Sequence, residues 1–113
     1  MAEVWNHDQI RMKNRFVFNA PITFDDNDES PTVINGSLFL TATGHSSAKN
    51  ITDFDNGVPG QIIIIVASNP ANKTTLVDGG QLLLNGNWTE AAGSTITLIN
   101  VEGGNWYEVA RTP

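Results

Sequence analysis

The most apolar stretch of the chain runs from Gln61 to Val66 and holds only β-branched residues after the glutamine. Successive side chains of a strand point to opposite faces, so a strand with one wet face alternates apolar and polar residues. This run does not alternate, and Leu82-Leu83-Leu84 repeats the feature on a shorter segment. Both faces of these strands therefore need cover. We expect one face to fill the chain's own core and the other to meet further copies of the chain, through Ile62, Ile63, Ile64, Ile65, Val66, Leu82, Leu83, Leu84, Ile96 and Leu98.

Turns rich in glycine and asparagine divide the second half of the chain into short segments. The segments predict strands at about 51–54, 61–67, 74–77, 81–84, 95–101 and 105–110. Short strands at this spacing, separated by such turns, indicate an all-β sandwich, barrel or stacked-rung solenoid. No window repeats its apolar residues every 3.6 positions, so we expect essentially no helix.

The first half of the chain is less regular. Residues 16–18 and 22–24 predict two short strands, and Asn35-Gly36 predicts a type I′ hairpin turn within 32–43. Residues 1–15 are polar and poorly patterned, which predicts an extended N-terminal arm. Residues 16–113 are then a single all-β domain.

Composition narrows the classes of function. A chain of 113 residues is one domain with a modest core. Charged residues make up only 16%, which suits a surface that partners cover, and the net charge of −6 argues against binding nucleic acid. Without cysteine there are no disulfides or thiolate metal sites. No segment resembles a secretory leader or is long enough to cross a membrane, so we expect no membrane association.

No motif predicts catalysis, a cofactor or a metal. Asp53-Phe54-Asp55-Asn56-Gly57 begins like a calcium loop, but an EF-hand needs a glutamate where this chain has Ile64. We interpret it as an ordinary turn, and the acidic stretch 25–29 as a solvated loop or a charge partner for another subunit. Gly44-His45-Ser46 lacks the second glycine of a nucleophile elbow. Nothing pairs two carboxylates across a cleft as glycoside hydrolysis requires.

Aromatic residues gather near the end of the chain. Trp88, Trp106 and Tyr107 stand beside Asn87 and Asn105. Exposed aromatic rings could stack on sugars, but rings of this kind also pack within a protein or between subunits. Both interpretations stay open on the sequence.

A resemblance covers residues 30–112. It rests on Ser30-Pro31-Thr32-Val33-Ile34-Asn35-Gly36, Ile51-Thr52-Asp53-Phe54, Leu82-Leu83-Leu84 with Asn85-Gly86, Ile96-Thr97-Leu98 and the ending 105–111. This pattern resembles tailed-phage virion proteins, which include tail fibres, tailspike-associated modules, head fibres and capsid decoration proteins. The resemblance implies a homotrimer whose β rungs stack along, or wrap around, a three-fold axis. The fold we expect is therefore a stacked-rung β-helix, a β-prism-like domain or a small β-sandwich, assembled as a homotrimer.

The resulting functional expectation is a non-enzymatic structural protein of the virion, assembled in the host cytoplasm. It would be a homotrimeric capsid decoration (cement) protein or a short head fibre that binds the major capsid protein or another virion protein. The arm would anchor it through Trp5, Ile10, Arg11, Met12, Lys13 and Arg15. The alternative is a receptor- or glycan-binding tip of a tail or head fibre that uses Trp88, Trp106 and Tyr107.

Overall fold

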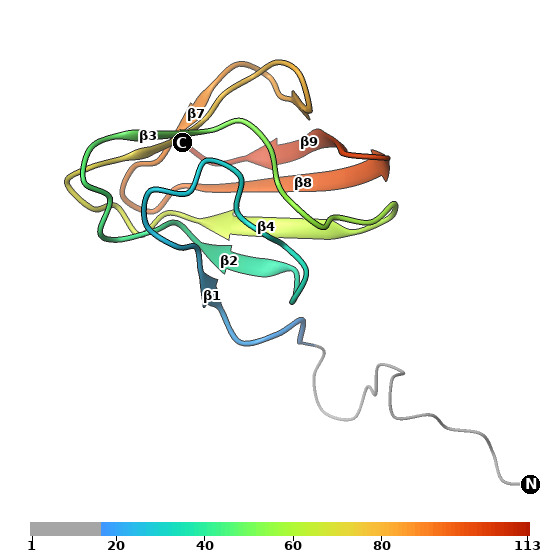
Figure 1. Ribbon diagram of the computed structural model, residues 1–113, viewed down its shortest axis with the longest axis horizontal. Coiled ribbons are helices and arrows are strands. Elements are labelled where there is room, and N and C mark those ends of the chain that lie inside the picture. Colours follow the sequence, from blue (N-terminus) through green and yellow to red (C-terminus); the bar gives the residue numbers. More distant parts are fainter. Residues whose placement is uncertain (1–16) are drawn as a thin grey trace, which may run out of the picture.

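The computed structural model describes residues 17–113, which form an all-β fold of two sheets (Figure 1). The strands are β1 (Ile22–Thr23), β2 (Leu38–Leu40), β3 (Lys49–Ile51), β4 (Ile62–Val66), β5 (Thr74–Leu76), β6 (Leu82–Leu83), β7 (Trp88–Thr89), β8 (Thr95–Glu102) and β9 (Asn105–Arg111). The large sheet has the order β1-β2-β4-β8-β9-β6, and the small sheet has the order β3-β5-β7. Residues 17–113 contain no helix, as the sequence predicted.

The middle of the chain alternates between the two sheets. It passes from β2 in the large sheet to β3 in the small one, then back to β4 and on to β5. The returning strands pair in parallel, β4 with β2 and β5 with β3, so this part of the chain winds as a coil. The coil ends at β8, which runs antiparallel to β4, and β9 runs antiparallel to β8. A two-layer arrangement results, in which β9 also pairs with β6, the edge strand of the large sheet.

The hydrophobic core lies between the two sheets. The large sheet contributes Phe39, Ile63, Ile65, Ile96 and Leu98, and the small sheet contributes Ile51, Leu76 and Trp88. Four aromatic rings add a line of contacts, with centroids 4.9 Å apart for Phe24 and Phe39, 5.9 Å for Phe24 and Phe54, and 5.8 Å for Phe54 and Trp106. Each fully buried aliphatic or aromatic side chain contributes about 1.5–3 kcal/mol.

The predicted hairpin at Asn35-Gly36 is wrong. A type I′ turn needs positive φ at both central residues, and neither Asn35 nor Gly36 has it. The side chain of Asn19 holds this segment instead, because its Oδ1 accepts hydrogen bonds from the N–H groups of Ser37 (2.8 Å) and Leu38 (3.2 Å). β2 consequently pairs in parallel with β1 and β4 rather than with the residues before the turn.

Other boundaries shift by a few residues. The strand predicted at 51–54 is β3, at Lys49–Ile51. Val17 and Phe18 form no strand, while the strand expected at 22–24 is β1. β7 was not predicted, because its two residues form no pattern of their own. The predicted arm, residues 1–15, lies outside the described residues.

Candidate functional site

The outer face of the large sheet is apolar and partly exposed. Inter-strand pairing aligns its outward side chains in three rows: Leu83, Tyr107, Ile99 and Ile62; Ala110, Thr97, Ile64 and Leu38; and Thr95, Val66, Leu40 and Thr23. None of these side chains is charged. Ile62 is 41% exposed and Leu83 is 39% exposed. We call these three rows the outer face.

The outward side of the small sheet is polar. Its aligned outward residues are Asn50, Thr75 and Thr89, all polar. The hydroxyl oxygens of Thr75 and Thr89 lie 2.8 Å apart and share a hydrogen bond. A sheet that meets water on one side normally carries polar residues there. The small sheet follows this rule and the large sheet does not.

A second apolar surface lies at one end of the molecule, on the right of Figure 1. β2 and β4 are parallel and β8 is antiparallel to them, so the loops before β2 and β4 meet the loop after β8. Ile34 (64%) and Val58 (59%) are exposed in the loops before β2 and β4, and Val101 (54%) is exposed near the end of β8. Val17 (67%) lies beside them, across a groove from Ile62. Loops usually expose polar residues, so these aliphatic tips are unusual. We call Val17, Ile34, Val58, Ile62 and Val101 the loop end.

Gln61 fixes the loops at this end. Its Nε2 donates to the carbonyl oxygens of Val33 and Gly36, at 2.9 Å each, and its Oε1 accepts from the N–H of Val58 at 3.1 Å. The N–H of Gly60 donates to the carbonyl oxygen of Asn100 at 2.7 Å, which ties the same loop to β8. A groove of about 420 Å³ lies here, lined by Val17, Phe18, Gln61 and Ile62 among others. The loop end is therefore a surface preformed by hydrogen bonds.

Glu90 is the one carboxylate that is buried among the described residues, with 2% exposure. Its Oε1 accepts from the Thr41 hydroxyl (2.7 Å) and the Asn69 N–H (2.8 Å), and its Oε2 accepts from the Thr74 N–H (2.6 Å). These partners follow β2, follow β4 and begin β5, so Glu90 links the two sheets. A carboxylate whose two oxygens are satisfied in this way is a structural anchor rather than a free acid or base.

His45 is also buried, with 6% exposure. Its Nδ1 lies 2.8 Å from the N–H of Asn27 and must accept that bond, so Nε2 carries the proton and donates to the Thr74 hydroxyl at 2.9 Å. Glu90 contacts the backbone of Thr74 and not the ring of His45. The pair therefore has no catalytic-triad geometry, and His45 serves to hold the acidic loop 25–29 against β5.

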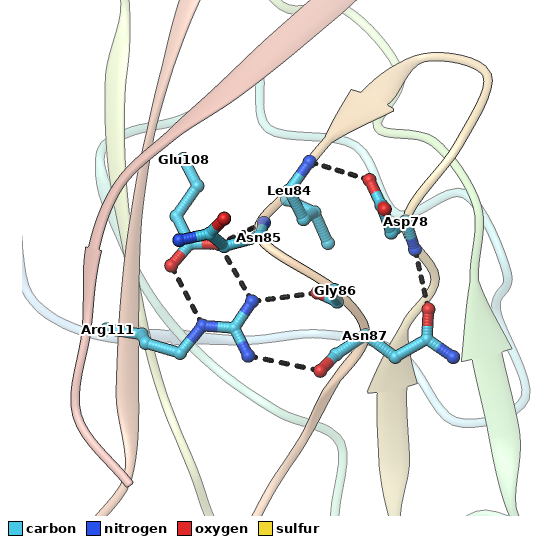
Figure 2. A network of polar contacts seen from close by, with 7 residues as sticks. All are labelled: Asp78, Leu84, Asn85, Gly86, Asn87, Glu108 and Arg111. Atoms are coloured by element: carbon cyan, nitrogen blue, oxygen red, sulfur yellow. Dashed lines mark hydrogen bonds and ion pairs between the residues drawn. The ribbon is translucent and has the colours of Figure 1, made fainter.

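Arg111, the last residue of β9, binds the loop that follows the edge strand β6 (Figure 2). Its Nε and Nη2 donate to the two carboxylate oxygens of Glu108 at 2.8 Å each, and Nη2 and Nη1 reach the carbonyl oxygens of Gly86 (2.7 Å) and Asn87 (3.1 Å). Glu108 also accepts from the N–H of Asn85 at 2.8 Å. The hydrogen bond from Arg111 is the main cause that lowers the pKa of Glu108, against the opposing effect of burial, and the same bond raises the pKa of Arg111. This cluster fastens the loop 84–87 to β9.

The residues predicted for the core and for contacts between copies divide into two groups. Ile63, Ile65, Leu82, Ile96 and Leu98 are 0% exposed and belong to the chain's own core. Ile62 and Leu83 are exposed, and Ile64, Val66 and Leu84 are partly buried. Only the second group is available to a partner.

Of the two interpretations left open for the late aromatic residues, the structure supports packing within the protein for both tryptophans. Trp106 is 0% exposed and Trp88 is 3% exposed, so neither ring can stack on a sugar, and only Tyr107, at 38%, reaches solvent. The two tryptophans fill the space between the sheets because their neighbours in β9 and β7 face outward. The predicted anchoring residues, Trp5, Ile10, Arg11, Met12, Lys13 and Arg15, lie outside the described residues.

The loop end is the feature that the sequence analysis missed. Ile34 and Val58 stand inside turn segments, next to Asn35 and between Gly57 and Pro59. An aliphatic residue at the tip of a glycine or proline turn was the available signal, since such a tip has no core to reach.

Within residues 17–113, no three histidine or acidic side chains gather as a metal site would need. The same part of the chain has no helix long and apolar enough to span a membrane. No family model, no curated protein and no solved structure matches the chain.

Proposed function

We propose that this chain is a non-enzymatic structural protein of a tailed-phage virion, a homotrimeric decoration (cement) protein or short head fibre that binds and stabilises the shell. The resemblance of residues 30–112 supports the virion, and the uncovered outer face of the large sheet is the observation that carries the assembly. A folded domain of this size that leaves a sheet face uncharged and apolar has a surface suited to permanent contact with other protein.

The buried polar groups favour a structural role over a catalytic one. Glu90, His45 and the Glu108–Arg111 pair are each engaged with backbone groups or hydroxyls that fix loops and sheets. An acid–base catalyst needs a group that is free to exchange a proton with a substrate. Among the described residues, none of these three clusters offers one in a cleft.

The loop end suits attachment to a larger surface. The described chain begins at Val17, within the loop end, so the residues proposed to anchor the protein precede this surface directly. A broad set of fixed aliphatic tips and the anchoring set Trp5, Ile10, Arg11, Met12, Lys13 and Arg15 would then face the same shell partner, the major capsid protein or another virion protein.

Binding to shells tests the proposal. The purified chain is added in increasing amounts to shells of its own phage that were assembled without it. We expect binding to saturate at a fixed stoichiometry that matches the shell's symmetry, and the shell's melting temperature to rise. A variant that lacks residues 1–15 should keep its oligomeric state and lose binding to the shell.

The opposite pattern would contradict the proposal. If the chain binds host cells or glycans and leaves the shell's melting temperature unchanged, it is a receptor-binding tip. If the truncated variant binds shells as well as the full chain, residues 1–15 are not the anchor.

A further inference from the structure

We infer that the outer face of the large sheet is the surface through which copies of this chain meet, packed around a common axis. This inference rests on the proposed function for the number of copies, three. The face itself follows from the residues and charges described above.

The two sheets of one molecule differ on their outward sides. The central row of the outer face places Thr97 between Ile64 and Ala110, whereas the small sheet presents Asn50, Thr75 and Thr89. Both sheets bury their inner faces in the same core. The apolar outer residues are therefore not required by the fold of a single copy, and they indicate a second layer of protein over the large sheet alone.

The distribution of charge also favours contact at the outer face. Each copy carries a net charge of −6, so two copies repel one another over most of their surfaces. The three rows of the outer face hold no charged side chain. Contact between like-charged copies costs least where neither contributes a charge, and a basic or acidic partner would find nothing to pair with here. The occupant must therefore present an uncharged apolar surface of its own, and the outer face of another copy is such a surface.

The direction of the strands suits packing around a three-fold axis. β2 and β4 run in one direction across the face, and the loop end lies where both strands begin. Three copies that pack their outer faces around a three-fold axis parallel to these strands have their loop ends on the same side. The trimer then offers three loop ends to one shell surface and keeps its outer faces out of water.

A matched pair of lysine substitutions tests the inference. Thr97→Lys introduces a charge at the centre of the outer face, and Thr89→Lys makes the same chemical change on the exposed side of the small sheet. Light scattering across a dilution series gives the mass of each, and circular dichroism confirms that each is folded. We expect the wild type and Thr89→Lys to be trimers and Thr97→Lys to be a folded monomer, with association at least about 100-fold weaker, because an unpaired ammonium group would be buried in each interface.

Each other outcome has a defined meaning. If the wild type is a trimer and a folded Thr97→Lys remains a trimer, the outer face is not the interface, although the proposed function stands. If Thr97→Lys does not fold, Ile62→Lys gives the decision, since Ile62 is already 41% exposed and a lysine there is tolerated by one copy. A monomeric wild type overturns the inference, and binding to the shell then decides the proposed function separately.

Discussion

Gly57 allows the closest packing in the core. A Cβ atom on Gly57 would lie 2.4 Å from the Trp106 ring and 3.1 Å from the side-chain nitrogen of Asn100. Both neighbours are 0% exposed and have no room to retreat. The glycine is therefore needed for space rather than for its backbone angle, since its φ is not positive.

Gly57→Ala should destabilise the fold by about 1–3 kcal/mol, the usual cost of overpacking a core. Gly104→Ala is the matched control. There the added Cβ would lie 2.8 Å from the side-chain oxygen of Gln81, the end of an exposed side chain that can move aside. Urea unfolding at one fixed protein concentration measures both, and equal losses for the two variants would contradict the proposed tight contact with Trp106.

Glu108 makes stability depend on pH in the acidic range. Its pKa in the folded protein lies below its ordinary value of 4.5, because of the hydrogen bond from Arg111. A group with a lowered folded pKa stabilises the fold above its unfolded pKa, and that contribution is lost as pH falls through the folded pKa.

We therefore expect the free energy of unfolding to fall below about pH 4.5 in the wild type. Glu108→Gln, which cannot titrate, should be less stable than the wild type at pH 7 and should lose less stability between pH 5 and pH 3. Urea titrations at several pH values measure both slopes. Parallel slopes would show that Glu108 does not contribute to acid sensitivity.

At the scale of strands and sheets, Glu90 connects the large sheet to the small one. The carboxylate joins the residue after β2, the loop after β4 and the start of β5 through three hydrogen bonds. An amide in its place would turn an N–H₂ group toward at least one N–H or O–H donor.

Glu90→Gln should therefore cost about 2–4 kcal/mol, because a buried donor loses its acceptor and another faces a donor. Glu102→Gln, at the exposed β8–β9 hairpin, should change stability by less than about 0.5 kcal/mol. Hydrogen exchange adds a local readout, since the amides of Asn69 and Thr74 should exchange faster in Glu90→Gln alone. Unchanged protection at both amides would show that the carboxylate does not hold the two sheets together.

The elements that the sequence predicted best are those with strong local signals. Ile62–Val66 and Thr95–Glu102 are rich in β-branched residues and are followed by turn residues, Ser68-Asn69-Pro70 and Gly103-Gly104, and both were predicted to within a residue or two. Which strands pair with one another was harder to predict from the sequence. Nothing local in Leu38–Leu40 says that it pairs with β4 in parallel, and Asn35-Gly36 lost its usual turn to the distant side chain of Asn19. A two-residue strand such as β7 exists only because its neighbours position it.

For the whole molecule, the sequence anticipated that one copy has apolar strand surface to spare. It did not say which side chains face outward, because an unbroken apolar run has no polar residue to mark its wet face. The register between β4 and β8 supplies that information, with Ile63 and Ile65 inward and Ile62, Ile64 and Val66 outward. For Trp88 and Trp106 the sequence left sugar stacking and internal packing open, and their burial shows that both rings belong to the core.

The molecule also has two unlike ends. Val17 lies beside Ile62, where β4 begins, and the N–H of Thr112 donates to the carbonyl oxygen of Thr95, which is paired with Val66 where β4 finishes. The far end carries Ser68, Asn69, Asn72 and Lys73 in place of aliphatic tips. Whatever follows Pro113, native or grafted, emerges on that hydrophilic side. If the loop end faces the shell as proposed, a peptide joined after Pro113 would be displayed toward the medium, within reach of an antibody.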